Sequence, residues 1–141
     1  MENLKKYADT VYQIIGAAMR VHNELGGGLL EPIYNEALHI ELLETGIQNE
    51  SEKMLNCYYK THILDKIYRM DIVVDDIVIE LKAATEIIPE HRLQLFNYLR
   101  LTKKPIGLLI NFGLNILSGE RYYYDKITNE CHLLDKYLNP L

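Results

Sequence analysis

The chain has 141 residues, of which 48% are hydrophobic and 25% are charged, and its formal net charge at pH 7 is −5. This balance is that of an ordinary globular protein, which excludes disordered and collagen-like classes, and we expect one domain over residues 1–141. No apolar run approaches the ~20 residues of a membrane helix, and the N-terminus lacks a secretory signal, so we expect a cytoplasmic protein. The acidic charge argues against a strong non-specific grip on nucleic acid, although most of the excess lies in the first half.

Two helices are predicted in the first third of the chain. From residue 4 to residue 25 the apolar side chains recur at the spacing of one helical face. Three glycines at 26–28 follow, and glycine readily adopts the left-handed conformations that end a helix. A second helix is predicted to begin near Pro32, which suits a first turn, and to stop at Gly46.

Three strands are predicted in the middle of the chain. Residues 53–64 indicate one strand, and residues 66–74 and 77–84 indicate two more that are rich in Ile and Val. Asp75-Asp76 separates the last two and is a candidate for a tight turn. The last two strands are therefore predicted to form a hairpin.

The remaining third predicts one helix and further strands. Pro89 opens a helix that runs to about residue 101, and the apolar run 105–112 is typical of a buried strand. Residues 120–124 indicate an edge strand, and the tail can pair again around His132. The order ααβββαββ predicts the α/β (α+β) class, with a central mixed sheet flanked by helices.

The most informative segment is the predicted hairpin YRMDIVVDDIVIELKA, residues 68–83. If Asp75-Asp76 is a two-residue turn, Val74 faces Ile77, and further along the hairpin two acidic residues face each other and two basic residues face each other. Because side chains alternate along a strand, one sheet face then carries Arg69, opposite Lys82, and Asp71, opposite Glu80. The other face is predicted to carry Met70, Ile72, Ile79 and Leu81.

On that face the Cβ atoms of Asp71 and Glu80 would lie roughly 4.5–5.5 Å apart, and the two carboxylates would repel each other unless a positive group lies between them. Mg²⁺ typically takes one or two carboxylates with waters and a substrate phosphate. Lys82 would orient the attacking water or stabilise charge on the phosphate, so the pattern indicates a metal-dependent phosphodiesterase. The alternative is a surface ladder of ion pairs, Asp71 with Lys82 and Glu80 with Arg69, and the spacing alone leaves the two hypotheses even.

Three further groups of residues have both a structural and a functional interpretation. Glu31, at the start of the second helix, either complements the helix dipole or adds a third carboxylate to the site. Gln94, on the third helix, either lies at the surface or points its amide at the site. Four basic residues on that helix and directly after it are either solvated or contact a phosphate backbone: Arg92, Arg100, Lys103 and Lys104.

Three motifs in this order resemble the GxxExxY family. HNELGGGLLEPIYNEAL (residues 22–38) has Gly28, Glu31 and Tyr34 at the named positions. The hairpin 68–83 is similar to that family's strand pair, and HRLQLFNYLRLTKKPIGLLINFG (residues 91–113) is similar to its following helix and strand. The resemblance covers most of the chain and implies membership of the PD-(D/E)xK nuclease-like superfamily.

By this resemblance the chain has a restriction-endonuclease-like core and uses Mg²⁺ or Mn²⁺. The resemblance implies one catalytic set, of which the three carboxylates also bind the metal: Asp71, Glu80, Glu31, Lys82 and Gln94. The implied function is a divalent-metal-dependent nuclease acting on nucleic acid, with DNA favoured. Arg69 and the four basic residues of the third helix are the predicted contacts to that nucleic acid.

Two other functions stay open on the sequence. The acidic net charge favours a non-catalytic module on the same fold that binds nucleic acid or a protein. Metal-dependent chemistry on a small phosphorylated molecule is a third hypothesis. Because so short a chain shows no target-recognition module, we expect a homodimer or a partner protein, and no membrane partner.

Overall fold

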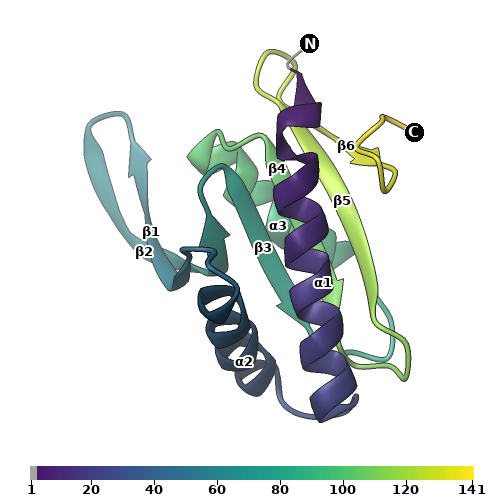
Figure 1. Cartoon of the computed structure of the whole chain (residues 1–141). Coiled ribbons are helices and arrows are strands. Elements are labelled where there is room, and N and C mark those ends of the chain that lie inside the picture. The colour runs from purple at the N-terminus through teal and green to yellow at the C-terminus, as the bar shows by residue number, and fades with distance from the viewer. Residues whose placement is uncertain (1–2) are drawn as a thin grey trace.

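A six-stranded sheet lies between helices in the computed structural model, which describes residues 3–141 (Figure 1). The elements follow one another in this order: η1 (Leu4–Tyr7), α1 (Ala8–Leu25), α2 (Glu31–Glu44), β1 (Glu50–Tyr59), β2 (His62–Val74), β3 (Ile77–Lys82), α3 (Pro89–Thr102), β4 (Ile106–Asn111), β5 (Ser118–Asp125) and β6 (Glu130–Leu134). The predicted helices are thus confirmed, with a 3₁₀ turn before α1. Within residues 3–141 no helix is long and apolar enough to cross a membrane.

The strands lie side by side in chain order from β1 to β6. All neighbours are antiparallel except β3 and β4, which are parallel because α3 connects them from end to end. The predicted mixed sheet flanked by helices is confirmed. The prediction that residues 120–124 form an edge strand is wrong, because β6 pairs along β5, and the order is ααβββαβββ. The last strand, β6, is five residues long, and its apolar and polar residues do not clearly alternate. The sequence therefore predicted only that the tail could pair around His132.

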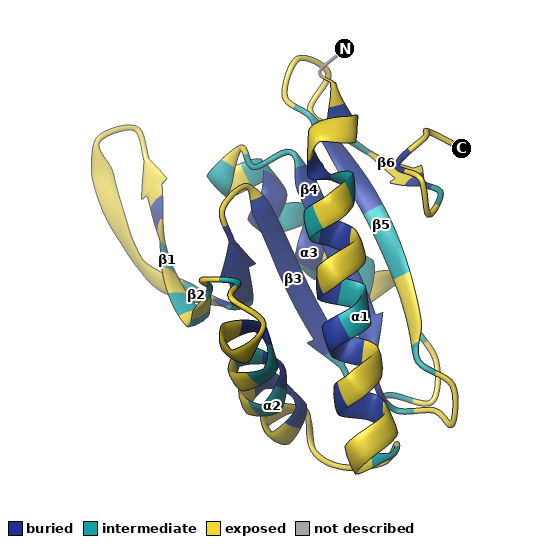
Figure 2. Cartoon of the chain, in the orientation of Figure 1, coloured by how far each residue is buried: buried dark blue, intermediate teal, exposed yellow. Residues whose placement is uncertain are grey.

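The two faces of the sheet are covered differently. Helices α1 and α2 pack on one face and α3 on the other (Figure 1). The central strands β3 and β4 are buried on both faces, as Figure 2 shows in dark blue. This explains why their sequences are nearly continuous apolar runs rather than alternating ones.

A two-stranded arm formed by residues 53–69 projects from the body (Figure 1), and most of its residues are exposed (Figure 2). The predicted boundary between the first two strands is wrong. The chain turns after Tyr59 and returns from His62, with Lys60 in the left-handed region at φ 55°. The turn carries Lys-Thr, without the Gly, Pro, Asn or Asp that mark most turns, so the sequence did not indicate it.

The loop between α1 and α2 is held by the tyrosine of the first motif. Tyr34 is fully buried and stacks on Phe112, with ring centroids 4.7 Å apart. Its hydroxyl donates to the carbonyl of Gly26 at 2.6 Å and accepts the N–H of Leu29 at 3.0 Å. Gly27 has no room for a side chain, since a Cβ there would lie 2.6 Å from the carbonyl oxygen of Leu114. The motif therefore places the first residue of α2, and the carboxylate it carries, at a fixed point beside the sheet.

Candidate active site

The hairpin register near the turn is the predicted one. Val74 lies opposite Ile77, and Ile72 lies opposite Ile79. Within residues 3–141 the β2–β3 ladder ends at that second pair, and beyond it the Oδ2 atom of Asp71 accepts the backbone N–H of Leu81 at 2.8 Å. A carboxylate thus takes the place of a backbone carbonyl where the two strands part. The predicted pairing of Arg69 with Lys82 is therefore wrong.

The predicted orientation of Met70 is also wrong. Met70 packs with Val73 in the core on the α3 side, whereas Ile72 packs on the side of α1 and α2. The regular alternation of side chains along β2 is therefore broken between Met70 and Ile72. The partner strand is irregular at the same level, because Glu52 has φ 51° and interrupts the pairing with β2. Arg69, the last residue of the arm, is exposed.

The two carboxylates form the centre of the site. Glu80 is only 2% exposed, and its Oε1 atom has no hydrogen-bond partner among residues 3–141. The Nζ atom of Lys82 lies 3.4 Å from the other oxygen, Oε2. Burial, reinforced by the negative charge of Asp71, raises the pKa of Glu80 to about 9 against the opposing effect of Lys82. The surface ladder of ion pairs is not formed, since Glu80 is buried and Asp71 bonds to the backbone.

Lys82 is held by a chain of polar groups from α3. Its Nζ donates to Oε1 of Gln94 at 3.1 Å, and Nε2 of Gln94 donates to the Tyr98 hydroxyl at 2.9 Å. The Tyr98 hydroxyl in turn donates to the carbonyl of Arg69 at 3.1 Å. Burial raises the pKa of Tyr98 to about 12, so this hydroxyl keeps its proton at neutral pH. Gln94 therefore points into the site, and Tyr98, one helical turn further along α3, is a further residue of the site.

Glu31 lies near Asp71. It lines a pocket of about 480 Å³ together with Asp71 and with Glu52, a carboxylate that the sequence had not indicated. Asn35, one turn further along α2, donates to the backbone carbonyl of Asp71 at 3.3 Å and fixes α2 against β2. Among residues 3–141, however, no three side chains of His, Cys, Asp or Glu lie close enough together to hold one metal ion.

The carboxylate pair nevertheless has the chemistry that a divalent cation requires. Mg²⁺ and Mn²⁺ prefer oxygen ligands, and Glu80 offers an oxygen that no described protein group occupies. A bound cation would also replace the proton that the raised pKa of Glu80 retains near neutral pH. Asp71 and Glu80 are therefore the residues best suited to hold the metal, with Glu31 as the nearest further carboxylate in the adjoining pocket.

The predicted basic contacts are spread along α3 and do not converge on the carboxylates. Arg92 forms a two-pronged ion pair with Glu120, at 2.8 and 2.9 Å. Lys104 donates to the carbonyl of Asp75 at the hairpin turn, about 13 Å along the strand from Asp71. Lys103 donates to the Tyr124 hydroxyl, and Arg100 donates to Asn97. A role for these residues in binding nucleic acid stays a prediction.

The comparisons with known proteins agree with this fold. The crystal structure of SSO0001 superposes with a TM-score of 0.52 at 18% sequence identity, over 88% of this chain. The chain spans 64% of that protein, and at this identity the likeness shows the fold alone. No curated protein matches the sequence. The model of the PD-(D/E)XK nuclease superfamily matches residues 8–122, the range that contains both carboxylates, the lysine and the glutamine, and the chain belongs to this superfamily.

Proposed function

We propose that the protein is a divalent-metal-dependent nuclease that hydrolyses phosphodiester bonds of nucleic acid, with DNA as the favoured substrate. The observation that carries the proposal is the buried Glu80 carboxylate, whose Oε1 has no partner among residues 3–141 and whose Oε2 lies 3.4 Å from Lys82. Burial of such a carboxylate without a hydrogen-bond donor costs free energy, and groups of this kind are found most often at functional sites. Superfamily membership supports the reaction class, because PD-(D/E)XK nucleases generally use divalent metals.

The residues have distinct roles in this proposal. Asp71 and Glu80 would hold Mg²⁺ or Mn²⁺, with Glu31 supplying a further oxygen from the adjoining pocket. When bound, the ion would polarise the scissile phosphate and lower the pKa of a coordinated water. Lys82, fixed between Glu80 and Gln94, would donate hydrogen bonds to the attacking water or to a phosphate oxygen that gains negative charge. Gln94 and Tyr98 are positioning residues that act through Lys82.

The arm offers a contact surface beside the site. It is continuous with the part of β2 that carries Asp71 and projects from the body (Figure 1), and its basic residues outnumber its one acidic residue. Those residues are Lys53, Lys60, Lys66 and Arg69, against Asp65. Basic side chains attract the phosphate backbone independently of its sequence. A strand that passes the carboxylates would therefore lie against the arm, which supports the prediction for Arg69.

The test is cleavage of single-stranded, duplex and branched DNA and RNA with Mg²⁺ or Mn²⁺. We expect Lys82→Ala to lower the cleavage rate by about 10²–10³-fold, the usual cost of removing one group that stabilises developing charge. The matched control is Lys126→Ala, a lysine in the exposed turn between β5 and β6, which should leave the rate unchanged. Cleavage that survives Lys82→Ala contradicts the proposed role of the lysine. Binding of nucleic acid without cleavage of any substrate favours the non-catalytic module instead.

A further inference from the structure

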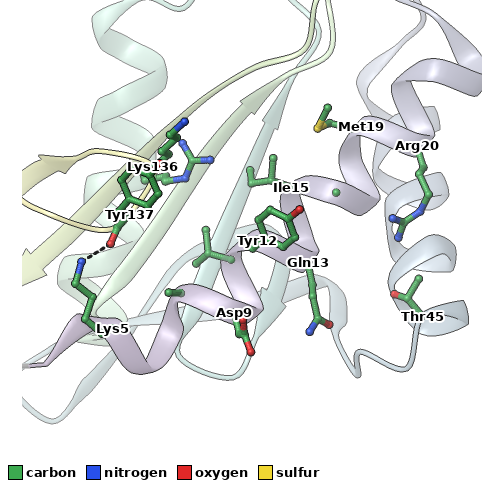
Figure 3. Close-up of a pocket in the computed structure, with 14 residues that line it drawn as sticks. Lys5, Asp9, Tyr12, Gln13, Ile15, Met19, Arg20, Thr45, Lys136 and Tyr137 are labelled. Atoms are coloured by element: carbon green, nitrogen blue, oxygen red, sulfur yellow. Dashed lines mark hydrogen bonds between the residues drawn. The ribbon is translucent and has the colours of Figure 1, made fainter.

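The outer side of α1 borders a hollow of about 950 Å³ that is separate from the carboxylate site (Figure 3). Its apolar part is formed by Val11, Tyr12, Ile15, Met19 and Tyr137. Its basic part is formed by Lys5, Arg20, Arg121 and Lys136. Asp9 is the acidic residue among those that line it. We call this hollow the basic groove. Arg20 is already paired with Glu41 of α2 at 2.7 Å, so the positive character of the groove rests on Lys5, Arg121 and Lys136, and it contrasts with the net charge of −5 of the whole chain.

The basic groove lacks a covering element within residues 3–141. Tyr12 is 80% exposed and Met19 is 52% exposed, and with Ile15 they follow the i, i+3, i+7 spacing of one helical ridge. The Nε atom of Arg121 is buried there and has no hydrogen-bond partner among the described residues. An apolar ridge flanked by basic side chains fits an amphipathic helix that carries carboxylates.

Helix α2 has such a surface on the side that faces away from the core. Its buried residues, Tyr34, Leu38 and Leu42, lie on one side. The residues on the opposite side follow helical spacing, are exposed, and combine apolar and acidic side chains: Ile33, Glu36, Ile40, Leu43 and Glu44. We call these five residues the acidic ridge. Since α2 contains no Lys or Arg, its charge is complementary to that of the basic groove.

We propose that the acidic ridge of one copy of this chain docks into the basic groove of a second copy, so that the protein forms a symmetric dimer. Both surfaces lie on the same face of the sheet, with α1 between α2 and the part of the groove near Lys136 and Tyr137 (Figures 1 and 3). A two-fold rotation about an axis parallel to α1 places each ridge over the other copy's groove. The two identical contacts close the assembly at a dimer instead of extending it into a filament.

Two features of α1 and of the site are compatible with this arrangement. Gly16 lies between Tyr12 and Met19 on the outer surface, where a Cβ would meet only the end of the Arg20 side chain. The two α1 helices can therefore approach closely near the axis. Glu80 is on the α3 side of the sheet, together with the core residue Val78, so this carboxylate lies away from the proposed interface.

The experiment measures the molar mass of the 141-residue chain by sedimentation equilibrium over a wide concentration range. The ridge variant Ile40→Arg and the groove variant Tyr12→Glu/Lys136→Glu should each weaken dimerisation at least about tenfold, because like charges then meet in the interface. Ile127→Arg is the matched control, since Ile127 is 90% exposed in the turn between β5 and β6. A mixture of the ridge and groove variants should form a heterodimer, because one intact ridge then meets one intact groove and the new charges attract.

A monomeric wild type at every concentration overturns the proposal. It is equally overturned if Ile40→Arg weakens the dimer no more than Ile127→Arg, or if the mixed variants form no heterodimer. Circular dichroism confirms that each variant is folded, and Ile33→Arg on the same ridge replaces Ile40→Arg if the latter unfolds. Nuclease activity is not part of this measurement, so a failure of the dimer leaves the proposed function intact.

Discussion

Replacing Glu80 by Gln should stabilise the metal-free protein. The carboxyl group is buried beside Asp71, and its pKa rises from 4.5 to about 9 in the folded state. Near neutral pH the folded protein therefore keeps a proton that the unfolded chain releases. Glutamine keeps an oxygen for Lys82 and has nearly the same shape, but it has no ionised form to be disfavoured.

The magnitude follows from that difference in pKa. Because the folded-state pKa is raised, the contribution of Glu80 to stability is fully present below pH 4.5 and is lost as the pH rises toward 9. At pH 7 the loss is on the order of 3 kcal/mol, and at pH 5 it is below about 1 kcal/mol. Glu80→Gln should therefore raise the melting temperature by roughly 10 °C at pH 7 and by much less at pH 5.

The assay is thermal unfolding of both proteins between pH 5 and pH 8, first with a chelator and then with Mg²⁺ or Mn²⁺. Metal should stabilise the wild type and should have little effect on Glu80→Gln, because a neutral amide is a poor ligand for these ions. A variant that is less stable than the metal-free wild type at pH 8 refutes the reasoning. That result would mean that Lys82 keeps Glu80 ionised in the folded protein.

Three further predictions concern the same residues and the loop that places them. The affinity for Mg²⁺ should rise up to about tenfold per pH unit between pH 6 and pH 8, because the metal must displace the proton of Glu80, and calorimetric titration at several pH values measures this; an affinity independent of pH contradicts it. Tyr34→Phe should lower the free energy of unfolding by about 1 kcal/mol in urea titration, since it removes the two hydrogen bonds that the hydroxyl makes to the loop, whereas Tyr58→Phe on the exposed arm should change nothing. Gly27→Ala should destabilise the protein through its contact with the Leu114 carbonyl, and an unchanged denaturation midpoint would show that the loop can move aside.

Much of the fold was predictable because its signals are local. Helical periodicity followed by glycines located α1 and α2, and the two aspartates at 75–76 set the register that places Val74 opposite Ile77. Membership of the superfamily is confirmed. The narrower resemblance to the GxxExxY family and the cytoplasmic location stay predictions. The strands that were misjudged, at the tip of the arm and at β6, are those whose turns or patterns carry weak local signals.

The site was only partly predictable, because its chemistry depends on environment. The sequence by itself determined that Asp71, Glu80 and Lys82 lie on neighbouring strands, since alternation and a tight turn leave little freedom there. Only the tertiary structure decided that Glu80 is buried with a raised pKa. The packing of α3 likewise decided that Gln94 holds Lys82.

Two arginines also show the difference between what local sequence predicts and what the tertiary structure decides. Arg69 was expected opposite Lys82 because a regular hairpin was assumed, but the β2–β3 ladder ends at Ile72 and Ile79. Arg92 is paired with Glu120 on a strand 28 residues away, which the sequence did not indicate, and its contact with phosphate stays a prediction. Local sequence patterns determine which side chains alternate on a regular strand or helix. Where that regularity breaks, and which distant group neutralises a charge, depends on contacts between segments far apart in the chain, and only the folded structure brings those together.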